Sequence, residues 1–136
     1  MSNNKLAISI FLIAIAVLFG FDSNAKPKGK GEMKMKETVH DFGNIKEADG
    51  PVSVSFTFTN VGKANLIIYE AKADCGCTTP EYPKAPIAPG KSGKIKVTYN
   101  PLGRPGAFDK SVTIKTNGNP TKVRVKVRGT VMPKNR

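Results

Sequence analysis

The chain has 136 residues, a length that accommodates one domain with a substantial core but excludes two ordinary domains. Hydrophobic residues make up 39% of it, with 13 glycines, 10 prolines and no tryptophan, a balance that favours a turn-rich all-β domain and disfavours a helical bundle. The formal net charge of +12 favours anionic neighbours, although exposed lysines also keep β proteins soluble.

Residues 1–25 have the pattern of a secretory signal peptide. Lys5 gives a positive start, residues 6–19 form an apolar run, and Ser23 and Ala25 are small residues at the −3 and −1 positions of a cleavage site. The apolar run is shorter than the ~20 residues that a transmembrane helix needs, and no cysteine follows the cleavage site to accept a lipid. We therefore predict a protein exported to the periplasm or beyond, with no stable membrane anchor after cleavage.

Residues 26–37 are rich in lysine and poor in apolar side chains, which predicts a flexible basic linker. Met33 and Met35 together with His40 offer thioether and imidazole groups that suit copper. We interpret the two methionines as linker residues instead. At the other end of the chain, residues 133–136 are predicted to be a disordered tail.

Residues 38–132 show the side-chain alternation of β-strands. The clearest strand is 52–59, where valine and phenylalanine alternate with serine and threonine. The other predicted strands are 39–45, 66–73, 94–99, 108–114 and 122–128. Turns recur between them at the spacing typical of sandwiches, so we predict an immunoglobulin-like antiparallel β-sandwich of about seven strands, with a partly closed barrel as the alternative.

Three local patterns predict details of this domain. Residues 66–69 are apolar at every position, which indicates deep burial. In the predicted strand 108–114, Lys110 occupies the same alternate position as Phe108, Val112 and Ile114. Because a lysine does not face a dry core, a bulge or an edge position is expected there. Pro89 and Gly90 fit the middle of a type II turn, and the prolines around them exclude a regular central strand.

The last predicted strand has one apolar and one basic face. Its valines alternate with Lys122, Arg124, Lys126 and Arg128. No aromatic side chains are interleaved with these charges to stack on bases, so we do not expect nucleic acid to bind. The predicted partner is another protein or an anionic component of the cell envelope.

Both cysteines of the chain lie in the stretch Cys75-Gly76-Cys77. Export to an oxidising compartment favours a disulfide, which requires Gly76 to bend the chain, because residues i and i+2 of a fully extended strand lie close to the separation limit. Packed thiols and a soft-metal site are the alternatives. His40 is the candidate third ligand, although a closed zinc site wants four, and we commit to no metal.

No catalytic constellation is apparent. The chain has one histidine and no Gly-x-Ser-x-Gly, so a nucleophile and a base cannot be paired. The sequence therefore predicts a non-enzymatic interaction or structural module without a cofactor. A thiol-based copper, zinc or redox protein that uses Cys75 and Cys77 is the alternative.

Five short motifs carry a family resemblance, which covers about residues 39–131. They are His40-Asp41-Phe42-Gly43, Phe58-Thr59-Asn60-Val61-Gly62, Cys75-Gly76-Cys77-Thr78, Pro86-Ile87-Ala88-Pro89-Gly90 and Gly129-Thr130-Val131. In this order they resemble the bacterial family called domain of unknown function 1573 and, more distantly, the immunoglobulin-like domains of Hydin and major sperm protein. The resemblance implies a seven-stranded sandwich in an exported or cell-surface setting, and it implies no reaction.

Overall fold

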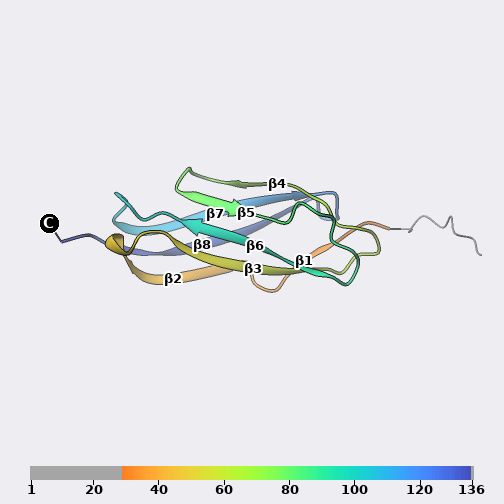
Figure 1. Cartoon of the computed structure of the whole chain (residues 1–136), viewed down its shortest axis with the longest axis horizontal. Helices are drawn as coiled ribbons and strands as arrows, with labels where there is room; N and C mark the ends of the chain where they lie inside the picture. The colour runs from red at the N-terminus through yellow and green to blue at the C-terminus, as the bar shows by residue number, and fades with distance from the viewer. Residues whose placement is uncertain (1–28, 136) are drawn as a thin grey trace, which may run out of the picture.

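The computed structural model describes residues 29–135, so the predicted signal peptide and its cleavage site lie outside the described residues. Two four-stranded sheets lie face to face in an elongated sandwich (Figure 1), which confirms the all-β sandwich prediction. The elements are β1 (Met33–Met35), β2 (Val39–Lys46), a 3-10 turn (Glu47–Asp49), β3 (Val52–Asn60), β4 (Ile68–Ala73), β5 (Thr78–Glu81), β6 (Ser92–Tyr99), β7 (Gly106–Thr116) and β8 (Lys122–Met132). Between residues 29 and 135, no helix has the length and apolarity to cross a membrane.

The first sheet has the strand order β1-β3-β6-β5, and the second has the order β2-β8-β7-β4. Every neighbouring pair is antiparallel except β2 and β8, which run parallel and make the second sheet mixed. All four edge strands are joined in pairs across the sandwich. The chain passes from the first sheet to the second between β1 and β2, and from the second sheet back to the first between β4 and β5. The second of these crossings contains the two cysteines.

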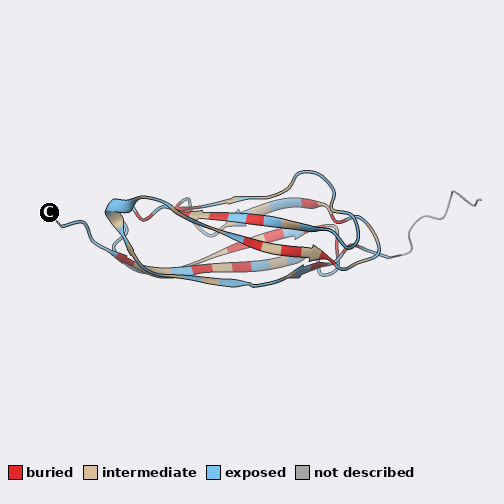
Figure 2. Cartoon of the chain, turned by 60° about the horizontal axis from the view of Figure 1, so that its bottom comes forward, coloured by how far each residue is buried: buried red, intermediate tan, exposed pale blue. Residues whose placement is uncertain are grey.

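The core consists of the inward-facing side chains of both sheets, which alternate with exposed residues along each strand (Figure 2). Its buried apolar members are Met33, Phe56, Phe58, Leu66, Ile68, Cys77, Ile95, Val97, Tyr99, Phe108, Val112, Ile114, Val125, Val127 and Val131. Each sheet also pairs a phenylalanine with a glycine: Phe58 lies opposite Gly93, and Phe108 lies opposite Gly129. Each ring fills the space where the glycine has no side chain.

The linker prediction is wrong from Lys30 onward. Strand β1 pairs with the end of β3, and the side chain of Met33 is buried in the core rather than free to bind metal. The residues before β1 are also held, because Lys63 N–H donates to the carbonyl of Lys30 (3.0 Å) and Val61 N–H donates to that of Glu32 (2.9 Å). Backbone hydrogen bonds order this segment, and composition alone does not reveal them.

One of the three local predictions needs correction. Leu66 and Ile68 are buried as expected, but Tyr69 is 63% exposed. No bulge occurs at Lys110, because the register of β7 on β8 is continuous. The predicted edge position is observed: β4 ends at Ala73, opposite Val112, so that β7 lacks a neighbour on that side at Lys110.

The type II turn is confirmed: Gly90 has φ +79°, and Lys91 N–H donates to the carbonyl of Ala88 (3.0 Å). The sequence did not predict strand β5, which contains Pro80 and lies at an edge, where proline is tolerated. After β8, residues 133–135 have no regular secondary structure.

Candidate functional site

The cysteine turn lies where the chain passes from β4 in the second sheet to β5 in the first. A disulfide joins Cys75 and Cys77, whose Cα atoms are 5.3 Å apart. A fully extended chain would separate them by about 7 Å. The shorter separation arises because the chain turns at Gly76, as predicted.

Backbone hydrogen bonds to both sheets hold this turn independently of the disulfide. On the β7 side, Asp74 N–H donates to the carbonyl of Ser111 (3.0 Å), and Ser111 N–H donates to the Asp74 carboxylate (3.1 Å). On the β6 side, Asn100 N–H donates to the carbonyl of Cys77 (2.9 Å). A bridge that closes a three-residue loop removes little chain entropy, equivalent to about 1.6 kcal/mol of stability in the loop-closure model. The disulfide is therefore a minor contributor to the fold.

The two sulfurs have different surroundings. Cys77 is 4% exposed, whereas Cys75 is half-buried. The hydroxyl of Thr78, itself buried, lies 3.6 Å from the sulfur of Cys77 and 3.9 Å from that of Cys75. The N–H of Cys77 donates to the sulfur of Cys75 (3.2 Å). Each sulfur thus has a hydrogen-bond donor beside it.

The structure does not bring His40 to the cysteines, so the candidate three-ligand set does not form. His40 lies on β2 and the cysteines follow β4, at opposite edges of the same sheet. Three strand spacings, about 14 Å, separate these edges. The His40 ring packs edge-on against Phe42 at 4.6 Å between centroids. Among the described residues, no cluster of three or more histidine, cysteine, aspartate or glutamate side chains could hold a metal ion.

The four predicted basic residues of β8 face outward, but the structure divides them into two pairs. Lys126 and Arg128 form ion pairs with Asp109 (3.4 Å) and Asp41 (3.2 Å). Lys122 and Arg124 are exposed and have no carboxylate partner between residues 29 and 135. Strand β4 adds Lys72, which is exposed and aligned with Arg124 across Thr113 of β7. We call Lys72, Lys122 and Arg124 the basic cluster.

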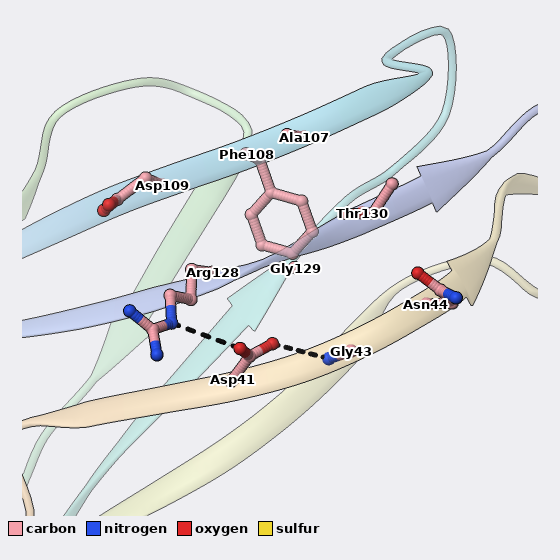
Figure 3. A pocket seen from close by; sticks show the side chains of 9 residues that line it. All are labelled: Asp41, Gly43, Asn44, Ala107, Phe108, Asp109, Arg128, Gly129 and Thr130. Carbon is pink, nitrogen blue, oxygen red and sulfur yellow. Dashed lines mark hydrogen bonds and ion pairs between the residues drawn. The ribbon is translucent and has the colours of Figure 1, made fainter.

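A shallow hollow of about 550 Å³ opens on the same outer face, at the other end of β8 (Figure 3). Residues of β2, β7 and β8 line it, among them Gly43, where a Cβ would meet nothing within 4 Å. At its rim, the Asp41 carboxylate accepts hydrogen bonds from Gly43 N–H (2.8 Å) and Arg128 Nε (3.2 Å). Asp41 thereby fixes the irregularity in β2, where Phe42 and Gly43 lie opposite the single residue Gly129 of β8 and Gly43 has φ +66°.

Residues 33–131 match the model of the family described as protein of unknown function (DUF1573). The chain belongs to this family. No curated protein matches this DUF1573 chain. The predicted relation to Hydin and major sperm protein domains stays a prediction.

Several solved structures are similar to the DUF1573 chain in fold alone, since sequence identity is 20% or lower. A protein of unknown function from Porphyromonas gingivalis W83 has a TM-score of 0.63 at 20% identity, over 74% of this chain and 46% of that one. The secreted serine protease VesC from Vibrio cholerae has a TM-score of 0.54 at 15% identity, over 79% of this chain and 24% of the protease. The YadV chaperone has a TM-score of 0.50 at 17% identity, over 76% and 52%. The DUF1573 chain therefore spans less than half the length of the first two proteins.

Sequence reasoning missed the role of Asp41, whose partner Arg128 lies 87 residues away in the chain. We expect the Asp41 carboxyl to titrate below its ordinary pKa, first because Gly43 N–H donates to it and second because Arg128 faces it. Because the pKa is lowered in the folded state, the resulting stabilisation is present above the unfolded pKa and is lost as the pH falls through the folded value. In Arg128→Gln, the pKa should rise yet stay below the ordinary value, since the Gly43 bond remains. An NMR titration of the carboxyl carbon measures both values, and an ordinary pKa in Arg128→Gln would contradict the assignment to Gly43.

Proposed function

We propose that this DUF1573 domain is an exported, non-enzymatic module that binds a polyanionic component of the cell envelope through the basic cluster. The signal-peptide pattern of residues 1–25 supports export, and the net charge of +12 supports an anionic partner. The second sheet presents the contact surface.

The observation that carries this proposal is the uneven pairing of charge on one outer face. Three ion pairs, Glu70 with Lys115, Asp109 with Lys126 and Asp41 with Arg128, neutralise most of the face. The basic cluster is left with its charges exposed. Two strand spacings place Lys72 about 10 Å from Arg124, and Lys122 is about 7 Å along β8 from Arg124. These separations are close to the screening length at physiological salt, about 8 Å, so the three potentials overlap.

Charge attraction is better supported than strand addition, because the sheet edges are poor templates. Strand β1 has only three residues, β5 contains Pro80, and β2 is interrupted between Asp41 and Asn44. On β4, the hydroxyl of Tyr82 donates to the edge carbonyl of Tyr69 (3.3 Å). Short strands, prolines and bulges discourage pairing with another chain.

Neutralising the basic cluster tests the proposal. In the triple variant Lys72→Gln, Lys122→Gln and Arg124→Gln, affinity for vesicles that carry an anionic phospholipid should fall about a hundredfold, because each basic residue near such a surface contributes about 1 kcal/mol. Affinity for the acidic polysaccharide alginate, measured in parallel, shows whether the partner is a lipid surface or a soluble polyanion. Vesicle sedimentation and titration calorimetry provide the measurements.

A control variant removes the same number of charges from the other sheet and its turn. Lys34, Lys91 and Lys94 are exposed and take part in no ion pair within residues 29–135. Their replacement by glutamine should weaken binding less than tenfold if the cluster is the site. Equal losses in both triple variants would show that only the total charge matters and would contradict a defined site.

A metal-carrier function receives less support, because His40 lies at the far edge of the second sheet and Cys75 and Cys77 are joined to each other. A redox function of Cys75 and Cys77 remains as the alternative, and the surroundings of the two sulfurs indicate which reaction it would be.

A further inference from the structure

We propose that the Cys75–Cys77 disulfide is an exchangeable bond that reacts with thiols, either a small thiol or a cysteine of another protein, and that Thr78 supplies the hydrogen-bond donor for the sulfur that leaves. This activity is independent of the basic cluster. It goes beyond the proposed binding function, because it gives the cysteine turn a chemical role of its own.

The first support is that the fold does not depend on the bond. The hydrogen bonds of Asp74 with Ser111, one of them to the Asp74 carboxylate, and of Cys77 with Asn100 already anchor the turn to both sheets. A three-residue loop is the weakest kind of covalent clamp in the loop-closure model. The bond can therefore open while the sandwich stays folded.

The second support is access from one side. Cys75 is half-buried and Cys77 is almost fully buried, so an incoming thiolate reaches the sulfur of Cys75. Gly76, which is exposed between them, leaves the approach open: apart from Cys75 and Cys77, no residue has a heavy atom within 4 Å of the position that a Cβ would take there. Gly76 also has no positive φ that would demand glycine.

The exchange proceeds in two steps. A thiolate RS⁻ attacks the sulfur of Cys75, a new R–S–S bond forms, the Cys75–Cys77 bond breaks, and its electron pair goes to Cys77 as a thiolate. A second RS⁻ then attacks the R sulfur of the mixed disulfide, releases RSSR and leaves Cys75 as a thiolate. Each protein thiolate takes one proton from solvent, so the disulfide is reduced and two RSH are oxidised.

The third support is that each leaving sulfur has a donor in place. The Thr78 hydroxyl, 3.6 Å from the sulfur of Cys77, can donate to the thiolate formed in the first step. This contact matters because Thr78 and Cys77 are both 4% exposed, so water has little access to the charge. The N–H of Cys77, 3.2 Å from the sulfur of Cys75, serves the thiolate formed in the second step.

The test follows reduction of the full mature protein by excess glutathione. Samples quenched in acid should carry glutathione on Cys75 and not on Cys77, as located by peptide mass spectrometry. Thr78→Val, which keeps the shape and removes the hydroxyl, should slow reduction about tenfold, the value of one hydrogen bond to a charged atom, and Thr78→Ser should restore the rate. Circular dichroism and vesicle binding, unchanged in both variants, separate this result from misfolding and from failure of the basic cluster.

Three outcomes would overturn the proposal: no reduction unless denaturant is added, glutathione attached to Cys77, or equal rates for Thr78→Val and the unchanged protein. If Thr78→Val fails to fold, reduction without denaturant and the site of glutathione attachment still test the proposal.

Discussion

Replacing Asn60 with alanine is expected to destabilise the domain by about 4 kcal/mol, because the side chain makes four hydrogen bonds that nothing else can replace. Its oxygen accepts from the N–H groups of Glu32 (3.1 Å) and Gly62 (3.0 Å). Its nitrogen donates to the carbonyls of Ala64 (2.8 Å) and Ile87 (2.9 Å). Asn60 has no exposed surface, and its removal leaves the N–H groups of Glu32 and Gly62 without these bonds, whereas the carbonyl of Ile87 keeps the bond from Leu66 N–H.

Urea unfolding of Asn60→Ala and of Asn44→Ala measures this effect. Asn44 is an exposed residue of β2 for which no side-chain hydrogen bond is seen within residues 29–135, and its replacement should change stability by less than about 0.5 kcal/mol. A loss below about 1 kcal/mol in Asn60→Ala would show that its partners are satisfied by water, and the buried network would then be absent in solution.

Asn60 also illustrates what the sequence could reveal. An asparagine at the end of an alternating strand indicates a turn, and the turn is present. Two of its four partners, Glu32 and Ile87, are 28 and 27 residues away, in segments without alternation. A local pattern therefore located the residue but not the network that makes it a central anchor.

The same physical limit explains which strands were predicted. The residue patterns of the longer strands identified β2, β3, β4, β6 and β7 to within about two residues at each end, and β8 from its first residue but short of its last four. Strands β1 and β5 have three and four residues, too few for a period of two to stand out from composition. Both are edge strands held by a longer neighbour, so the information that specifies them lies in β3 and β6.

In the candidate site too, local features were predictable from sequence and features that depend on strand order were not. The bend at Gly76 was predictable because a bond between residues two apart constrains only the chain between them. The pairing of Arg128 with Asp41 and of Lys126 with Asp109 depends on strand order, and β2 lies beside β8 although the two are at opposite ends of the domain. The basic residues could therefore be identified from sequence, but not which of them remain unpaired.

The second large effect is expected at Gly62, which the chain places against the segment that leads into β1. A Cβ on Gly62 would overlap the carbonyl oxygen of Lys30 and lie 2.6 Å from the nitrogen of Glu32 and 2.7 Å from the carbonyl carbon of Gly31. All three are backbone atoms, which cannot rotate away as a side chain would. We expect Gly62→Ala to cost about 3 kcal/mol by overpacking.

The matched control is Gly76→Ala. Neither glycine has a positive φ, and a Cβ on Gly76 meets nothing within 4 Å, so only the steric term differs between the two variants. Urea unfolding should show the loss in Gly62→Ala alone, accompanied by faster amide hydrogen exchange across residues 30–36 as β1 detaches from β3. Equal stability in the two variants, with fast exchange already present in the unchanged protein, would mean that residues 30–35 do not pack on β3, and the domain would then begin near residue 38, as the sequence alone indicated.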